Sequence, residues 1–283
     1  MDELGDASAL LARPAALRER AAAEGVLLLR GLAPAHDIAA LRLEVLRLCA
    51  MAGWLHPRTD PREGVAAPGT AYTEQSPEYR PLYREIQRLR RFHALALHPA
   101  LLAAVEAIVG RPVLAHPRNI ARVSFPACTR FTTPAHQDFY HVRGCADTWT
   151  AWIPLGACPR ERGGLAVMPG SHAEPLLATH AADGAGGAAV ETGTLPWRWA
   201  TADYDTGDVL LFHSHTIHKA LPNMSPDRLR LSVDYRYQRA ADAIHPSSLE
   251  PHLGVASWEE VYDGWPDDGL RYYWRALNPR IQA

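Results

Sequence analysis

The spacing of apolar residues changes near residue 110 of the chain. Before that point, apolar positions recur at helical spacing among Ala, Leu and Arg residues, and glycine stands where helices should end, as at Gly25 and Gly110. The run 26–30 is continuously apolar up to Arg30 and predicts a short buried strand. The pattern predicts helices over 14–24, 37–52 and 99–109.

Beyond residue 110 the chain consists of short β-branched and aromatic segments separated by Gly, Pro and Asn, which is typical of strands. We therefore predict a mainly β core of antiparallel character with flanking helices. The clearest strand candidates are 113–116, 121–125, 148–153, 209–212 and 229–237.

Two segments interrupt this pattern. The segment 181–189 (AADGAGGAA) predicts a flexible surface loop, and the aromatic tail after about 256 predicts helix that docks on the β core or forms an oligomer contact. No Pro-rich or Ser-rich linker divides the chain, so we expect residues 1–283 to form a single domain. Its expected parts are a helical region over about 1–110, a β core over about 111–240 and a helical tail over about 256–283.

Composition excludes several classes of protein. The 29 basic and 31 acidic residues give a net charge of -2, which predicts no nucleic-acid partner. We see no apolar run of roughly 18 residues, so no membrane span is expected. The acidic start, Met1-Asp2-Glu3, lacks the positive region of a signal peptide and predicts a cytoplasmic protein. The cysteines form no CxxC pair and predict reduced thiols, with a catalytic role for Cys145 the less favoured alternative.

The string His136-Gln137-Asp138 is the best candidate for chemistry. On a strand, residues i and i+2 point to the same face, so this imidazole and this carboxylate would project together. One further histidine would complete the 2-His-1-carboxylate triad of non-haem Fe(II) oxygenases. That histidine can come from the second cluster, His213, His215 or His218, while His172 fits a role in its turn better.

Four strings in order resemble the phytanoyl-CoA dioxygenase family of Fe(II)- and 2-oxoglutarate-dependent oxygenases. The resemblance covers about Val26 to Gln238. It implies a double-stranded β-helix, the cupin-like jelly roll, with His136, Asp138 and His218 as iron ligands. The strings are His136-Gln137-Asp138, the run 163–172 after a Trp-containing strand, the run 207–213, and His218 followed by Asn223 and a basic strand.

The resemblance also implies that Fe(II) and 2-oxoglutarate are the cofactors. Three protein ligands on one face of the ion leave positions for a 2-oxo acid and dioxygen. The far carboxylate of 2-oxoglutarate needs a bidentate cationic partner, a task for arginine. Arg230, followed by Ser232, resembles the Arg-x-Ser element that performs it, and Arg228 is the alternative because the loop after Asn223 differs in length from the family pattern. Trp152 matches a position that packs on 2-oxoglutarate.

Candidate substrate-binding residues surround the predicted metal site. Tyr140, His141 and Arg143 follow Asp138, Trp149 stands on the next strand with Trp152, and Arg122 precedes them. Pockets of this kind are mostly apolar with a few polar groups, which favours a small organic substrate.

We therefore expect an Fe(II)/2-oxoglutarate-dependent dioxygenase that hydroxylates a small organic molecule, such as a natural-product intermediate, with release of succinate and CO2. Its expected partners are that substrate and dioxygen, with no nucleic acid and no membrane, and its oligomeric state stays open. Asp138 argues against a halogenase, which needs the carboxylate position vacated for halide. The alternatives are epimerisation, desaturation or cyclisation by the same class of enzyme. A further alternative is a redox-neutral cupin-like metalloprotein.

Overall fold

The computed structural model describes residues 1–129, 131–267 and 269–282. Its larger sheet has the strand order β2-β10-β5-β12-β3, and β4 pairs with β12 as well. All of these pairings are antiparallel, as the strand pattern predicts. The strands are β2 (Val26–Leu29), β3 (Val113–Ala115), β4 (Ile120–Ser124), β5 (Trp149–Pro154), β10 (Val209–His213) and β12 (Arg230–Arg239).

A smaller sheet has the order β1-β9-β6-β11, and β7 and β8 form a separate hairpin. In this sheet β1 runs parallel to β9, and the other pairings are antiparallel. The strands are β1 (Asp2–Glu3), β6 (Leu165–Val167), β7 (Thr179–Ala181), β8 (Ala188–Val190), β9 (Ala200–Thr201) and β11 (His218–Ala220).

The two sheets face each other, because apolar side chains from both pack in one cluster. Leu28 and Phe212 of the larger sheet belong to the same buried cluster as Val167 and Ala220 of the smaller one. Since successive strand residues point to opposite faces, the alternate residues Leu27 and Leu211 lie on the outer face of the larger sheet.

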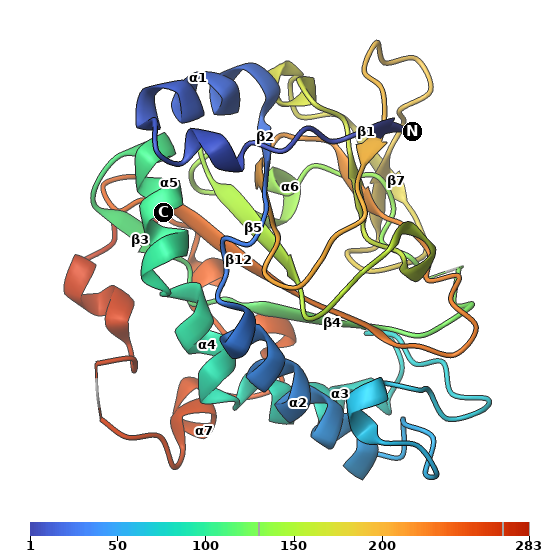
Figure 1. The fold of residues 1–283 in the computed structure, drawn as a ribbon. Helices are drawn as coiled ribbons and strands as arrows, with labels where there is room; N and C mark the ends of the chain where they lie inside the picture. Colours follow the sequence, from blue (N-terminus) through green and yellow to red (C-terminus); the bar gives the residue numbers. More distant parts are fainter. Residues whose placement is uncertain (130, 268, 283) are drawn as a thin grey trace.

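Helices cover that outer face. Leu17, Ile38 and Phe92 of three different helices share a buried cluster with Leu27 and Leu211. Figure 1 shows these helices grouped beside the strands, with β7 on the opposite side of the molecule. The helices are α1 (Pro14–Glu24), α2 (Ala35–Met51), α3 (Tyr79–Gln87), α4 (Arg90–Ala96), α5 (Pro99–Val109), α6 (Phe139–Val142) and α7 (Trp258–Tyr262).

The ends of α1 and α5 lie where the local sequence predicts them, at Gly25 and Gly110. Gly25 ends α1 in the left-handed conformation, with φ of 64°, and its N–H donates to the carbonyl of Ala21 at 2.8 Å. Glycine adopts this conformation without the steric cost of a Cβ, which is why the helix ends there.

Within the described part of the chain, one segment, Arg90–Val109, is long and apolar enough by composition to cross a membrane, which departs from the expectation that no such run exists. In the structure it is two helices, because α4 ends at Ala96 and α5 begins at Pro99. Phe92, Leu101 and Val105 pack in the buried cluster beneath the larger sheet, which accounts for the hydropathy of the segment.

Two predicted segments differ from the structure. The described residues of the tail form only the five-residue α7 and a 3-10 helix, Tyr273–Leu277, because Gly264, Pro266 and Gly269 interrupt the predicted helix. It docks on the molecule, as predicted, through a buried aromatic cluster. The segment 181–189 is the tip of the β7–β8 hairpin, and its residues 184–187 line a cavity instead of forming a loop exposed on all sides.

Candidate metal centre

His136, Asp138 and His218 meet where two chain segments pair. The N–H of His136 donates to the carbonyl of His218 at 2.9 Å, and the N–H of His218 returns the bond at 3.1 Å. The segment around His136 was predicted as a strand, but it forms only this isolated bridge, and Asp138 stands at the start of α6. The i, i+2 pair still converges, because the bridge fixes His136 and the helical turn aims Asp138 back toward it.

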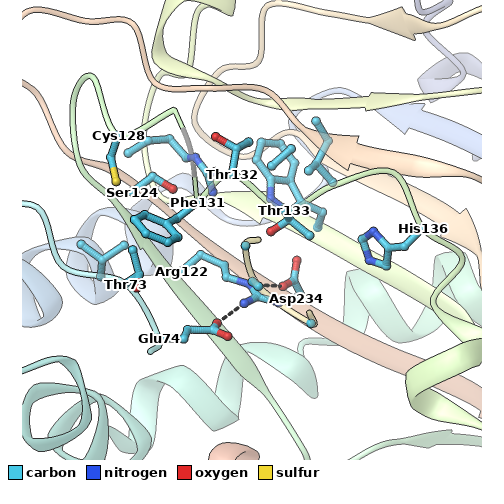
Figure 2. Close-up of a pocket in the computed structure, with 18 of the residues that line it drawn as sticks. Thr73, Glu74, Arg122, Ser124, Cys128, Phe131, Thr132, Thr133, His136 and Asp234 are labelled. Carbon is cyan, nitrogen blue, oxygen red and sulfur yellow. Dashed lines mark hydrogen bonds and ion pairs between the residues drawn. The ribbon is translucent and has the colours of Figure 1, made fainter. Parts of the chain in front are cut away.

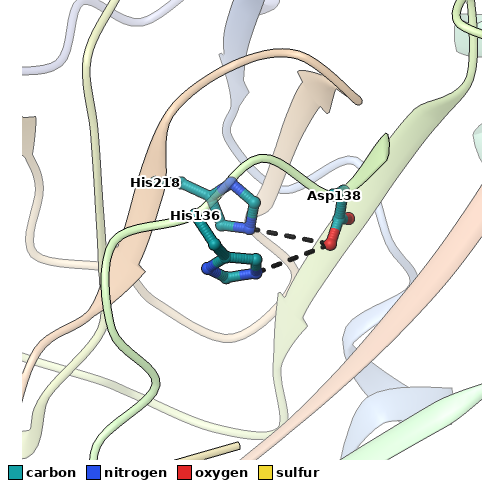
Figure 3. Close-up of side chains that lie close together, drawn as sticks. All are labelled: His136, Asp138 and His218. Carbon is teal, nitrogen blue, oxygen red and sulfur yellow. Dashed lines mark ion pairs between the residues drawn. The ribbon is translucent and has the colours of Figure 1, made fainter. Parts of the chain in front are cut away.

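The two imidazoles turn their Nε2 atoms toward one carboxylate oxygen of Asp138 (Figure 3). The distances from Nε2 to Oδ1 are 3.6 Å for His136 and 3.9 Å for His218. Each Nδ1 lies against a backbone carbonyl, that of Pro134 at 2.8 Å and that of Thr216 at 2.9 Å. A neutral imidazole that donates from Nδ1 keeps the Nε2 lone pair for a metal ion.

Asp138 is buried and held from two sides. Thr150 Oγ1 of β5 donates to Oδ2 at 2.7 Å, and Arg236 Nη2 of β12 lies 3.2 and 3.3 Å from the two carboxylate oxygens. Burial alone would raise the pKa of Asp138, but the Arg236 guanidinium and the two imidazoles hold this pKa well below its ordinary value. Asp138 is therefore ionised at neutral pH, the form that ligates metal.

His218 is fully buried beside His136. Burial, and then the neighbouring imidazole, lower the pKa of His218 to about 3, so its ring is neutral at pH 7 and able to ligate a metal. The other candidate histidines lie elsewhere: His213 packs against Trp149, and His215 against Phe139. Among the residues that the structure describes, His136, Asp138 and His218 are the one group with metal-ligating atoms all within 4.8 Å of one another.

A cavity of about 330 Å³ connects this group with Arg230. Apolar side chains, among them Trp152 and Phe212, line the part that belongs to the core between the sheets. Figure 2 shows another part of the wall, where Arg122 lies between Glu74 and Asp234.

Arg230 is a buried cation that forms no ion pair with any carboxylate of the residues that the structure describes. Nη1 donates to Ser232 Oγ at 2.8 Å, whereas Nε is buried without a hydrogen-bond partner among these residues. Burial lowers the pKa of the Arg230 guanidinium even though Asp234 lies in its neighbourhood. Burying an uncompensated charge is costly, so this side chain fits the far carboxylate of a 2-oxo diacid.

Arg228, the alternative to Arg230, lies outside the cavity. It precedes β12, is about one-third exposed, and its Nη1 contacts the carbonyl of Glu63 at 2.8 Å and a carboxylate oxygen of the same residue at 3.2 Å. A β-bridge to Val65 turns this part of the chain toward Glu63, so Arg228 does not share the face of Arg230 as predicted.

Only two of the five predicted substrate-binding residues are brought together. Arg122 lines this cavity and, with His141, an adjoining one, but Arg122 is paired with acids. Tyr140 and Arg143 are exposed and line neither cavity, because the short turn of α6 carries them outward. Trp149 packs in the core on the other face of β5, because it stands three positions before Trp152 and successive strand residues point to opposite faces.

Residues missed in the sequence also shape the site. Arg236 continues the alternation of Arg230, Ser232 and Asp234 along β12, so its position was available from the strand pattern. Thr150 stands two residues before Trp152 on β5 and shares its face by the same rule. Glu74 comes from a loop and its contact with Arg122 depends on tertiary structure alone.

Comparison with known proteins identifies the family. The model of the phytanoyl-CoA dioxygenase family matches residues 22–231. The chain belongs to this family. It is 33% identical over 207 residues to a 1-deoxypentalenic acid 11-β-hydroxylase from Streptomyces arenae, which covers 66% of this chain and 72% of the relative. The corresponding hydroxylase from Streptomyces exfoliatus is 33% identical over 171 residues, covering 54% of this chain and 59% of that one.

Solved structures agree with the jelly-roll fold. The 2-oxoglutarate-dependent epimerase SnoN from nogalamycin biosynthesis matches with a TM-score of 0.57 and 24% identity over 83% of this chain and 84% of that one. The carbocyclase SnoK from the same biosynthesis matches with a TM-score of 0.58 and 21% identity over 86% of this chain and 90% of SnoK. The predicted fold and the class of Fe(II)/2-oxoglutarate-dependent dioxygenase are thereby confirmed.

Proposed function

We propose that the chain hydroxylates an apolar small molecule of natural-product biosynthesis at the centre formed by His136, Asp138 and His218. The observation that carries the proposal is that this cluster shares one cavity with Arg230, a buried cation that no carboxylate of the described part of the chain pairs with. The curated relatives with hydroxylase activity support hydroxylation as the outcome.

The residues divide into separate tasks. His136, Asp138 and His218 hold Fe(II), while Arg236 and Thr150 orient the carboxylate of Asp138. Arg230, held by Ser232, receives the far carboxylate of 2-oxoglutarate, and Trp152 packs on its chain. The bound iron supplies activation of dioxygen. The reaction balances as one oxygen atom inserted into a C–H bond of the substrate and one into 2-oxoglutarate, which leaves as succinate and CO2.

Anaerobic titration with Fe(II) and 2-oxoglutarate tests the assignment, read from the visible metal-to-ligand charge-transfer band. Arg230→Ala should retain Fe(II) but bind 2-oxoglutarate ten- to a hundredfold more weakly, because a charge-assisted contact in a buried site contributes about 1.5–3 kcal/mol. Arg228→Ala is the matched control and should change this affinity less than about twofold, since Arg228 points to Glu63.

His218→Ala should abolish the band by removing a metal ligand, whereas His213→Ala should retain it. Equal 2-oxoglutarate affinity in the wild type and Arg230→Ala would contradict the role of Arg230. Product formation without consumption of 2-oxoglutarate would move the chain to redox-neutral chemistry.

The structural neighbours favour a second outcome for the same site. SnoN is described as an epimerase and SnoK as a carbocyclase. Isotope analysis separates these from hydroxylation. Succinate gains an atom of ¹⁸O₂ in every case, but only hydroxylation also transfers one into the oxidised substrate.

A further inference from the structure

A second cavity, of about 220 Å³, adjoins the metal centre. It shares His136, Asp138 and Arg236 with the first cavity, but neither Arg230 nor Trp152 lines it. A molecule in this second cavity therefore contacts the metal centre without occupying the 2-oxoglutarate end of the first one.

The arginines that line the second cavity differ in how their charges are compensated. Arg122 contacts Glu74 and lies 3.5 Å from Asp234. Arg236 contacts Asp138 at 3.2 Å. These two guanidinium groups are neutralised by carboxylates within the fold.

Arg118 has no such partner. Its Nη1 donates to the carbonyl of Ser247 at 2.8 Å, and no carboxylate of the described residues forms an ion pair with it. Glu250 acts on it only from a distance and is exposed to solvent. Burial lowers the pKa of Arg118, an effect that a bound anion would oppose.

Two buried histidines of this cavity, His116 and His252, add no positive charge at neutral pH. Burial lowers the pKa of His116 to about 4, and that of His252 well below its ordinary value. His252 is also engaged with the Tyr83 hydroxyl at 2.6 Å. Among the described residues that line the second cavity, Arg118 is therefore the one arginine that forms no ion pair with a carboxylate.

We propose that the second cavity binds the substrate and that Arg118 receives a carboxylate of that substrate. A single guanidinium binds the two oxygens of one carboxylate and balances its one negative charge. A phosphate group carries a charge of about −1.5 to −2 and would need further cations. Apolar side chains of Ile120, Val142 and Leu253 line the same cavity and fit a hydrocarbon skeleton. The inference rests on the proposed function and assigns its substrate class, a hydrocarbon carboxylic acid. Arg118 thereby takes the role of orienting the substrate that the sequence predicted for Arg143, because Arg143 is exposed.

The test compares cyclic hydrocarbon carboxylic acids with their methyl esters, which have nearly the same shape but no charge. Binding of mono-, bi- and tricyclic pairs is measured by anaerobic calorimetry on the protein loaded with Fe(II) and 2-oxoglutarate. In the wild type at least one acid should bind ten- to a hundredfold more tightly than its ester, and Arg118→Met should remove this difference.

Arg118→Lys should restore part of the preference for acids, because the charge is retained but not the bidentate geometry. Arg143→Met is the matched control and should behave like the wild type. The charge-transfer band of each variant reports whether the 2-oxoglutarate site is intact. A retained band in Arg118→Met indicates loss of the carboxylate contact alone, whereas a lost band indicates that the segment held through Ser247 has loosened.

Two results would overturn the assignment of Arg118. One is that no acid of the panel binds more tightly than its ester to the wild type. The other is that Arg118→Met retains the preference for acids. Absence of the charge-transfer band in the wild type would instead overturn the proposed function, whatever the behaviour of Arg118.

Discussion

Three arginines near the candidate metal centre differ in what compensates each charge. Arg236 is paired with Asp138, and Arg122 with Glu74 and Asp234, so both are part of the folded protein's own charge network. Among the described residues, Arg230 donates only to a neutral hydroxyl, that of Ser232. Because removing a charge from water costs several kcal/mol without a partner, this difference points to the residue that meets an anionic ligand.

A buried histidine away from the site gives the protein a pH-dependent stability. His93 of α4 places Nε2 2.8 Å from the carbonyl of Gln87, and the Asn119 amide approaches Nδ1 at 3.2 Å. Burial lowers the pKa of His93 to about 4, below its ordinary value near 6.5. The unfolded chain therefore binds this proton more readily, and stability is lost as the pH falls from about 6.5 toward 4.

We predict that His93 alone lowers the free energy of unfolding by about 2 kcal/mol between pH 7 and pH 5. Urea denaturation at both pH values checks this, with His93→Gln expected to show a shallower dependence by this amount. His36→Gln is the control, because the side chain of His36 is 83% exposed. An identical pH dependence in His93→Gln and the wild type would contradict the prediction.

At the scale of elements, alternate side chains of β5 point to opposite faces of the sheet, one toward the cavity and one toward the core. Trp149 lies with Ala151 and Ile153 in the cluster beneath the helices, whereas Thr150 and Trp152 line the cavity. One strand thus carries a packing face and a ligand face.

Replacing each tryptophan of β5 by phenylalanine should separate these two faces. Trp149→Phe should lower the free energy of unfolding by about 1–3 kcal/mol through lost packing and leave 2-oxoglutarate affinity unchanged. Trp152→Phe should weaken 2-oxoglutarate binding as well. Denaturation and anaerobic titration of both variants check this. Weakened 2-oxoglutarate binding in Trp149→Phe but not in Trp152→Phe would contradict the assignment of the Trp152 face of β5 to the cavity.

Elements with local determinants were predictable from the sequence. Pro99 and Gly110 bound α5 where predicted, because helix starts and ends depend on nearby residues. The strand predicted at His136 was wrong, since the i, i+2 spacing also fits a bridge that leads into the turn of α6.

The site was predictable as far as pairs of nearby residues go. The separation of His136 and Asp138 by one residue indicated a joint role, and the family pattern supplied His218. Contacts such as those of Glu74 with Arg122 join segments far apart in the chain, so only the folded arrangement of loops and strands defines them.

At the scale of the whole molecule, the C-terminal segment closes over α3 and α4. Trp265 Nε1 donates to the carbonyl of Arg88 at 2.9 Å, and its ring packs 5.3 Å from that of His93. Asp263 adds an ion pair with Arg88 at 3.1 Å. The tail was predicted either to dock on the β core or to form an oligomer contact. These contacts show that it docks within its own chain, against α3 and α4.

Trp265→Ala should therefore lower the free energy of unfolding by about 3–5 kcal/mol, the cost typical of deleting a buried tryptophan. The affinity for 2-oxoglutarate of the folded variant should stay unchanged, because Trp265 lines neither cavity. Met51→Ala is a control at an apolar side chain that is 84% exposed and should change stability by less than about 0.5 kcal/mol. Denaturation and light scattering check the prediction together. A small change in stability combined with dissociation of an oligomer would contradict it and show that Trp265 stabilises an interface between copies. Only an interface contact would change the assembly while leaving each folded chain nearly as stable as before.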